Sequence, residues 1–114
     1  MKKIGLETER GGQSFSAWRA DRFWTRLRGL MGRTLRAGDA MLLSPCGRIH
    51  SFFMKSPIDV VYLSRRGEVL GITPSMRPNT VGKRVRGAYE VLELYDGDAA
   101  KLGLAVGSRI IAKG

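Results

Sequence analysis

The sequence predicts a compact, mainly β domain of sandwich or barrel type, with one N-terminal amphipathic helix and one short C-terminal helical turn. The chain has 114 residues, of which 43% are hydrophobic, and such a chain is long enough for one core but too short for two domains. Its apolar segments are short and rich in β-branched or aromatic residues, and turn residues separate them, as is typical of all-β folds. We therefore expect residues 1–114 to form a single domain.

The expected strands are short apolar runs bounded by glycine, proline or aspartate. They are predicted over residues 3–7, 14–20, 40–43, 49–55, 58–63, 69–73, 88–95 and 108–112. Residues 65–67, Arg-Arg-Gly, predict a tight hairpin loop between two of these strands. Pro74 and Pro78 are expected to interrupt regular pairing, and the segment 80–87 is expected to be a solvated, mobile loop.

Two segments have helical features. Residues 22–31 place apolar side chains on one side of a helix and basic ones on the other, and Asp21 before them can accept backbone N–H bonds at the N-cap. Gly32, directly after them, is a typical residue for the end of a helix. Near the C-terminus, Asp98 is expected to cap one further helical turn over residues 99–102.

Basic residues dominate the charge of the chain. Lysine and arginine total 20 against 10 aspartate and glutamate residues, so the formal net charge is +10 at pH 7. A positive field of this size attracts anions, and the expected partner is an acidic protein or another polyanion. A basic patch is predicted around the helix and in the loop after the last proline, with the members Arg19, Arg22, Arg26, Arg33, Arg36, Lys83, Arg84 and Arg86.

Cysteine content and hydropathy bear on location. Cys46 is the only cysteine, so no internal disulfide is possible. The N-terminal residues contain no apolar run as long as that of a signal sequence, and no segment reaches the roughly 20 apolar residues of a membrane-spanning helix. We expect a cytoplasmic protein without a membrane span, present as a monomer or a small homo-oligomer.

Residues 45–59 hold the only cysteine and the only histidine, and three interpretations of this segment remain open. Cys46, His50 and Met54 are soft or borderline metal ligands that would share one face of a helix, although the aromatic residues around them favour a strand. Cys46, His50 and Asp59 could instead supply a nucleophile, its base and an orienting carboxylate. In the third interpretation the cysteine and methionine fill the core and the histidine bonds to backbone. We favour this structural interpretation, and so expect no metal and no cofactor.

Asp59 follows Pro57 and precedes an apolar run, which places it at the edge of the core. A buried aspartate must be paired or hydrogen-bonded. We therefore expect its carboxylate to accept backbone N–H bonds or to pair with an arginine such as Arg28 or Arg48. A catalytic role is the less favoured alternative.

Several stretches of the sequence together match the pattern of a known family. They are Arg-Gly-Leu-Met-Gly at 28–32, the segment 50–63, Gly-Glu-Val at 67–69, Val-Leu-Glu-Leu at 91–94, Gly97, Leu-Gly-Leu at 102–104 and Gly107. On these motifs the chain resembles the domain-of-unknown-function family 192 (DUF192) over nearly its whole length. The resemblance implies a mainly β sandwich or jelly-roll fold with an N-terminal helix, and no established biochemical activity. It also implies that some relatives are exported, and it suggests a structural role for Arg28, Gly29, Met31 and Pro57.

The residues leave three functions open. The first is a non-enzymatic binding or accessory module that presents a cleft near His50, Met54 and Asp59. The second is nucleic-acid binding through the basic helix and loop, although no recognised nucleic-acid-binding signature accompanies these charges. The third is a Cys- and His-dependent enzyme or a metal-binding protein. We favour the first, with the candidate cleft residues Cys46, His50, Phe52, Met54, Lys55 and Asp59.

Overall fold

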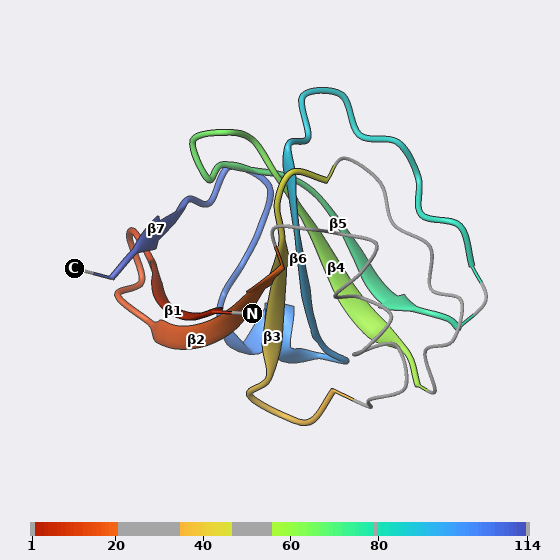
Figure 1. Ribbon diagram of the computed structural model, residues 1–114, viewed down its shortest axis with the longest axis horizontal. Helices are drawn as coiled ribbons and strands as arrows, with labels where there is room; N and C mark the ends of the chain where they lie inside the picture. Colours follow the sequence, from red (N-terminus) through yellow and green to blue (C-terminus); the bar gives the residue numbers. More distant parts are fainter. Residues whose placement is uncertain (1, 21–34, 47–55, 79, 114) are drawn as a thin grey trace.

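A curled β-sheet dominates the computed structural model, which describes residues 2–20, 35–46, 56–78 and 80–113 (Figure 1). Within these residues the sheet has 7 strands in the order β5-β4-β6-β3-β2-β1-β7. Neighbouring strands are antiparallel except for β2 and β3, which run parallel. The elements are β1 (Lys2–Thr8), β2 (Ser14–Ala20), β3 (Ala40–Leu43), β4 (Ile58–Leu63), β5 (Val69–Met76), β6 (Glu90–Tyr95), α2 (Asp98–Lys101) and β7 (Ile110–Ala112).

The strand positions agree closely with those expected from the sequence. β2, β3 and β4 have the predicted bounds, and β1, β6 and β7 differ from prediction by only one or two residues at an end. β5 was expected to end before Pro74, but it continues to Met76. The pairing shifts there from Val60 opposite Thr73 to Ile58 opposite Met76. Pro74 therefore lies in a bulge of β5. Proline has no backbone N–H, and at a bulge this absence removes no hydrogen bond between the two strands. The strand expected over 49–55 lies outside the described residues.

A single sheet that curls into a half-barrel replaces the two-layer sandwich or jelly roll that was expected. Leu6 and Ala17, near one end of the strand order, pack in the same cluster as Leu63 and Val69 from the other end. The sheet must bend until these side chains meet, and the concave surface that they line is called the inner face below. Ala99 of α2 belongs to the same cluster, so the half-barrel is filled. The barrel-like part of the prediction is confirmed, whereas the described residues form one curled sheet and not the two packed sheets that were predicted.

The two edges of the sheet meet at a junction of residues 67–69 with residues 107–110, which we call the seam. The N–H of Ile110 donates to the carbonyl of Gly67 at 2.9 Å. Val69 makes two further backbone hydrogen bonds to the same segment. Its N–H donates to the carbonyl of Ser108 at 2.8 Å, and its carbonyl accepts the N–H of Gly107 at 2.9 Å. Because β7 also pairs with β1, the seam joins the start of β5 to the opposite edge of the sheet.

Gly67 is required by the geometry of the seam. It ends the tight hairpin that the sequence predicted, where its N–H donates to the carbonyl of Ser64 at 3.0 Å. Its φ of 78 lies in the left-handed region that favours glycine. A Cβ at this position would overlap the carbonyl oxygen of Ile110. No larger residue fits without separating the two backbones.

The helical predictions have different outcomes. The described N-terminal residues form strands β1 and β2, as predicted, and supply no helix; the amphipathic helix predicted over 22–31 lies outside the described residues. α2 confirms the short C-terminal helical turn, but Gly97 is its N-cap, whereas Asp98 is already helical and makes no side-chain cap. Among the helices that the structure describes, none is long and apolar enough to cross a membrane.

Both faces of the central strands are buried, and all six residues of β4 have little exposure. The face opposite the inner face is called the outer face, and its buried cluster contains Met41, Leu43, Ile58, Val60, Tyr62, Met76 and Val91. Connecting segments cover this cluster with Leu35, Cys46, Val85 and Ala88. Residues of β4 therefore alternate between two different apolar environments.

Candidate functional site

The carboxylate of Asp59 accepts three backbone hydrogen bonds beneath α2. Asp59 pairs across the sheet with Leu94 of the inner face, and it is only 2% exposed. Its Oδ2 accepts the N–H groups of Gly97 at 3.0 Å and Ala99 at 2.9 Å, and its Oδ1 accepts that of Ser75 at 3.0 Å. Because glycine has no side chain to cap α2, the aspartate supplies the cap from a neighbouring strand. Asp59 thus has a structural role through backbone bonds.

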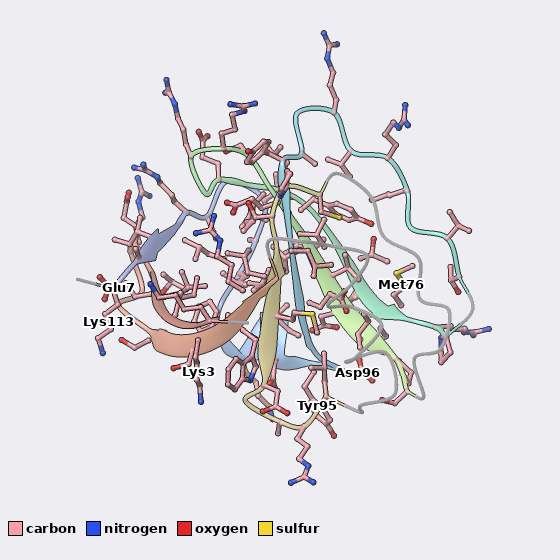
Figure 2. The ribbon with its side chains drawn as sticks, in the orientation of Figure 1. Lys3, Glu7, Met76, Tyr95, Asp96 and Lys113 are labelled. Carbon is pink, nitrogen blue, oxygen red and sulfur yellow. The ribbon has the colours of Figure 1, made fainter. Side chains whose placement is uncertain are left out.

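The end of the sheet beside α2 is acidic, and we call it the α2 end. The hydroxyl of Ser75 donates to the carboxylate of Asp96, which Figure 2 shows next to Tyr95 where β6 ends. Asp98 accepts the N–H of Gly38 at 2.8 Å and thereby ties α2 to the segment before β3. The acidic side chains of this end are therefore engaged in holding the fold.

Cys46 and Asp59 lie on opposite faces of the sheet. The N–H of Cys46 donates to the carbonyl of Tyr89 at 2.6 Å, and the residue packs against the outer-face cluster. The structure does not bring these two side chains into one site. Pro57 is half-buried directly before β4. The other members of the central motif and of the structural motif lie outside the described residues, namely His50, Phe52, Met54, Lys55, Arg28, Gly29 and Met31.

Glu93 is a buried acid that the sequence did not mark as functional. It lies on β6 between Met41 of β3 and Val60 of β4, its partners across the sheet on the outer face. The residue is 4% exposed, and burial disfavours its charged form and raises its pKa from 4.5 to about 7. In the described part of the chain, no three His, Cys, Asp or Glu residues gather as a metal site.

Two loops meet at the end of the sheet opposite α2, which we call the loop end (Figure 1). They are the β4–β5 turn at 64–68 and the segment 80–89. The N–H of Tyr89 donates to the carbonyl of Leu63 at 2.8 Å. The guanidinium of Arg65 lies 4.3 Å from the centre of the Tyr89 ring, which favours a cation–π contact. The two loops therefore form one surface.

This surface is strongly basic, and Figure 2 shows long nitrogen-tipped side chains extending from both loops. Its exposed cations are Arg65, Arg66, Lys83, Arg84 and Arg86. The sequence contains no acidic residue between Glu68 and Glu90. The α2 end, by contrast, carries Asp39, Asp96 and Asp98. The loop end therefore carries five exposed cations against Glu68, whereas at the α2 end the three aspartates more than offset Arg36 and Lys101.

The structure divides the basic patch that the sequence predicted. Arg36 is exposed at the α2 end, where its N–H donates to Asp39. Arg19 is exposed on β2, opposite Lys2 of β1. Three members of the patch, Arg22, Arg26 and Arg33, lie outside the described residues. Lys83, Arg84 and Arg86 lie at the loop end. Arg65 and Arg66 of the hairpin turn lie there too, and the predicted patch did not include them.

An open cleft of about 660 Å³ lies beside the seam, and we call it the seam cleft. Its charged lining residues are Arg10, Arg66, Arg109, Glu9 and Glu68. The guanidinium of Arg109 is fixed, because its Nη1 donates to Glu9 at 3.1 Å and its Nε donates to the carbonyl of Arg66 at 2.9 Å.

A smaller cleft of about 360 Å³, the side cleft, adjoins the seam cleft. Gln13 and Leu102 line both clefts. The side cleft also contacts Phe15, Ala40 and Leu94, which belong to or pack against the inner-face cluster. The two clefts therefore adjoin at these two residues, and together, as a charged part and a partly apolar part, they are called the groove.

Comparison with known proteins supports the family resemblance that the sequence motifs suggested. Two solved structures have this fold. One is a protein of Sinorhizobium meliloti 1021 described as a proposed transcription regulator, with 21% identity, a TM-score of 0.82, and coverage of 97% of this chain and 94% of that chain. The other is a protein of unknown function from Novosphingobium aromaticivorans DSM 12444, with 22% identity, a TM-score of 0.82, and coverage of 96% and 84%. No curated protein matches the chain. Residues 6–112 match the family DUF192, described as uncharacterized ACR, and the chain therefore belongs to that family.

Proposed function

We propose that this protein is a non-enzymatic binding module that holds the phosphate backbone of a nucleic acid at its loop end. The observation that supports the proposal is the union of two loops into one basic surface. Tyr89 joins the loops through its backbone bond to Leu63 and its ring contact with Arg65. A nucleic acid is a dense row of negative charges, and closely spaced exposed cations bind it through release of condensed counterions.

The charge distribution favours binding at this end over the rest of the sheet. At the α2 end Asp39, Asp96 and Asp98 outnumber the cations Arg36 and Lys101, whereas the segment that carries Lys83, Arg84 and Arg86 contains no acid. Contacts to phosphate position a nucleic acid without reading its sequence. The expected binding is therefore salt-dependent and only weakly selective for sequence.

Fluorescence anisotropy with a labelled DNA duplex of mixed sequence tests the proposal. Four phosphate contacts, from Arg65, Lys83, Arg84 and Arg86, give an expected slope of about −3.6 for log K against log salt. Affinity then falls about 100-fold between about 50 and 200 mM salt. The double variant Arg84→Gln/Arg86→Gln is expected to reduce the slope by about 2.

A matched double variant separates a site from a general effect of net charge. Arg36→Gln/Lys113→Gln removes the same charge from exposed positions outside the loop end, and it is expected to leave the slope unchanged. Equal weakening by both double variants would place the binding elsewhere on the surface. The absence of any anisotropy change at micromolar protein and low salt would refute nucleic-acid binding.

A further inference from the structure

The groove formed by the seam cleft and the side cleft has the dimensions of a small-molecule site. Its two parts measure about 660 and 360 Å³, and ligand pockets usually fall between about 300 and 1,000 Å³. They meet at Gln13 and Leu102. One wall of the seam cleft is the seam itself, whose backbone bonds hold residues 67–69 against residues 107–110. A wall fixed in this way lowers the ordering cost of binding.

The charges of the seam cleft suit a ligand with one negative charge. Arg109 is already paired with Glu9. Among the described residues, no carboxylate forms a salt bridge with Arg10 or Arg66. Three arginines and two glutamates line the cleft, which leaves one positive charge there. A single carboxylate matches that charge, whereas a phosphate dianion exceeds it.

The side cleft suits an apolar chain. Its acids are already engaged, because Asp39 accepts the N–H of Arg36 at 2.9 Å and Asp98 accepts that of Gly38 at 2.8 Å. Asp98 also lies 4.0 Å from the ammonium group of Lys101. The remaining lining is largely apolar, with the inner-face residues Phe15, Ala40, Leu94 and Leu102.

We propose that this groove binds a small carboxylic acid with an unbranched apolar chain. The carboxylate lies between the guanidinium groups of Arg10 and Arg66, and the chain passes Gln13 and Leu102 into the side cleft. A guanidinium group presents paired donors that fit the two oxygens of a carboxylate. The site shares Arg66 with the loop end, but it does not use Arg65, Lys83, Arg84 or Arg86, the four cations proposed to contact a nucleic acid.

Titration with octanoate, followed by amide chemical shifts in NMR spectra, tests the proposal. Octanoate, kept below its micelle-forming concentration, is expected to move the amide signals of Gly103 and Gly107, which line the seam cleft. Octanol lacks the charge and acetate lacks the chain, so each is expected to bind at least about tenfold more weakly. Equal binding of octanol or acetate would overturn the proposal, as would shifts confined to other regions.

Two sets of variants locate the site. Arg10→Gln/Arg66→Gln is expected to weaken octanoate binding about tenfold, and circular dichroism confirms that the variant is folded. Arg84→Gln removes an exposed cation from the loop end and is expected to leave octanoate affinity unchanged, although it weakens nucleic-acid binding. Octanoate affinity that is insensitive to the first variant, or that falls with the second, would refute the assignment. Loss of nucleic-acid binding without loss of octanoate binding would not contradict the proposed carboxylic-acid site.

Discussion

Replacing Gly67 with alanine is expected to open the seam and to destabilise the protein by about 3 kcal/mol. The residue has a φ of 78, and an L side chain in this region costs about 1–2 kcal/mol. The new Cβ would also overlap the carbonyl oxygen of Ile110. Relief of that overlap separates the backbones and breaks the bond from the N–H of Ile110 to Gly67, which contributes about 1 kcal/mol. The total is a large share of the about 5–15 kcal/mol that stabilises a typical domain.

Urea unfolding followed by far-UV circular dichroism measures this loss. Gly103→Ala is the matched control, because Gly103 has a similar φ of 68 but no atom lies within 4 Å of its added Cβ. The control is expected to lose only the part that comes from backbone strain, about 1–2 kcal/mol. Faster amide hydrogen exchange at Ile110 in the Gly67 variant would locate the damage at the seam. Equal free-energy losses in the two variants would refute the reasoning.

Two further substitutions test the buried acids. Burial raises the pKa of Glu93 from 4.5 to about 7, so the stability linked to its neutral form is fully present below about pH 4.5 and is lost as the pH rises through 7. Glu93→Gln is therefore expected to gain about 3 kcal/mol relative to wild type across that range, whereas Glu90→Gln on the opposite face of β6 is the control. Urea unfolding at about pH 5 and pH 8 measures the gain, and a pH-independent difference would contradict it. Asp59→Asn turns one acceptor into a donor, so it is expected to lose at least one of three backbone bonds and about 2–3 kcal/mol; unaltered urea unfolding would contradict this role.

The individual strands were predictable because local features specify them. The run Ile58–Leu63 is continuous in apolar and β-branched residues, apart from Asp59, and glycine at 67 ends the hairpin that follows. The order of the strands was not predictable in the same way. β6 inserts between β3 and β4, and β3 runs parallel to β2. These pairings join residues far apart in the sequence, and frequent short strands are compatible with either a sandwich or a curled sheet.

The functional residues were predictable only as residue types. Glu93 alternates with Leu92 and Leu94, a pattern that normally places a polar side chain in water. It is buried because both neighbouring strands and the covered outer face surround it. The cap of α2 likewise comes from Asp59 of β4 and not from the adjacent Asp98. In each case the decisive neighbour lies in another strand, so local sequence carries no signal for it.

The seam has a consequence for the growing polypeptide. Residues 107–110 leave the ribosome after every other described strand except β7 itself, which follows immediately. Until they emerge, β1 and residues 67–69 both present unsatisfied backbone groups, and such edges recruit strands from other chains. Residues 107–110 and β7 therefore protect two edges at once, and nascent chains are most prone to self-association before these residues appear.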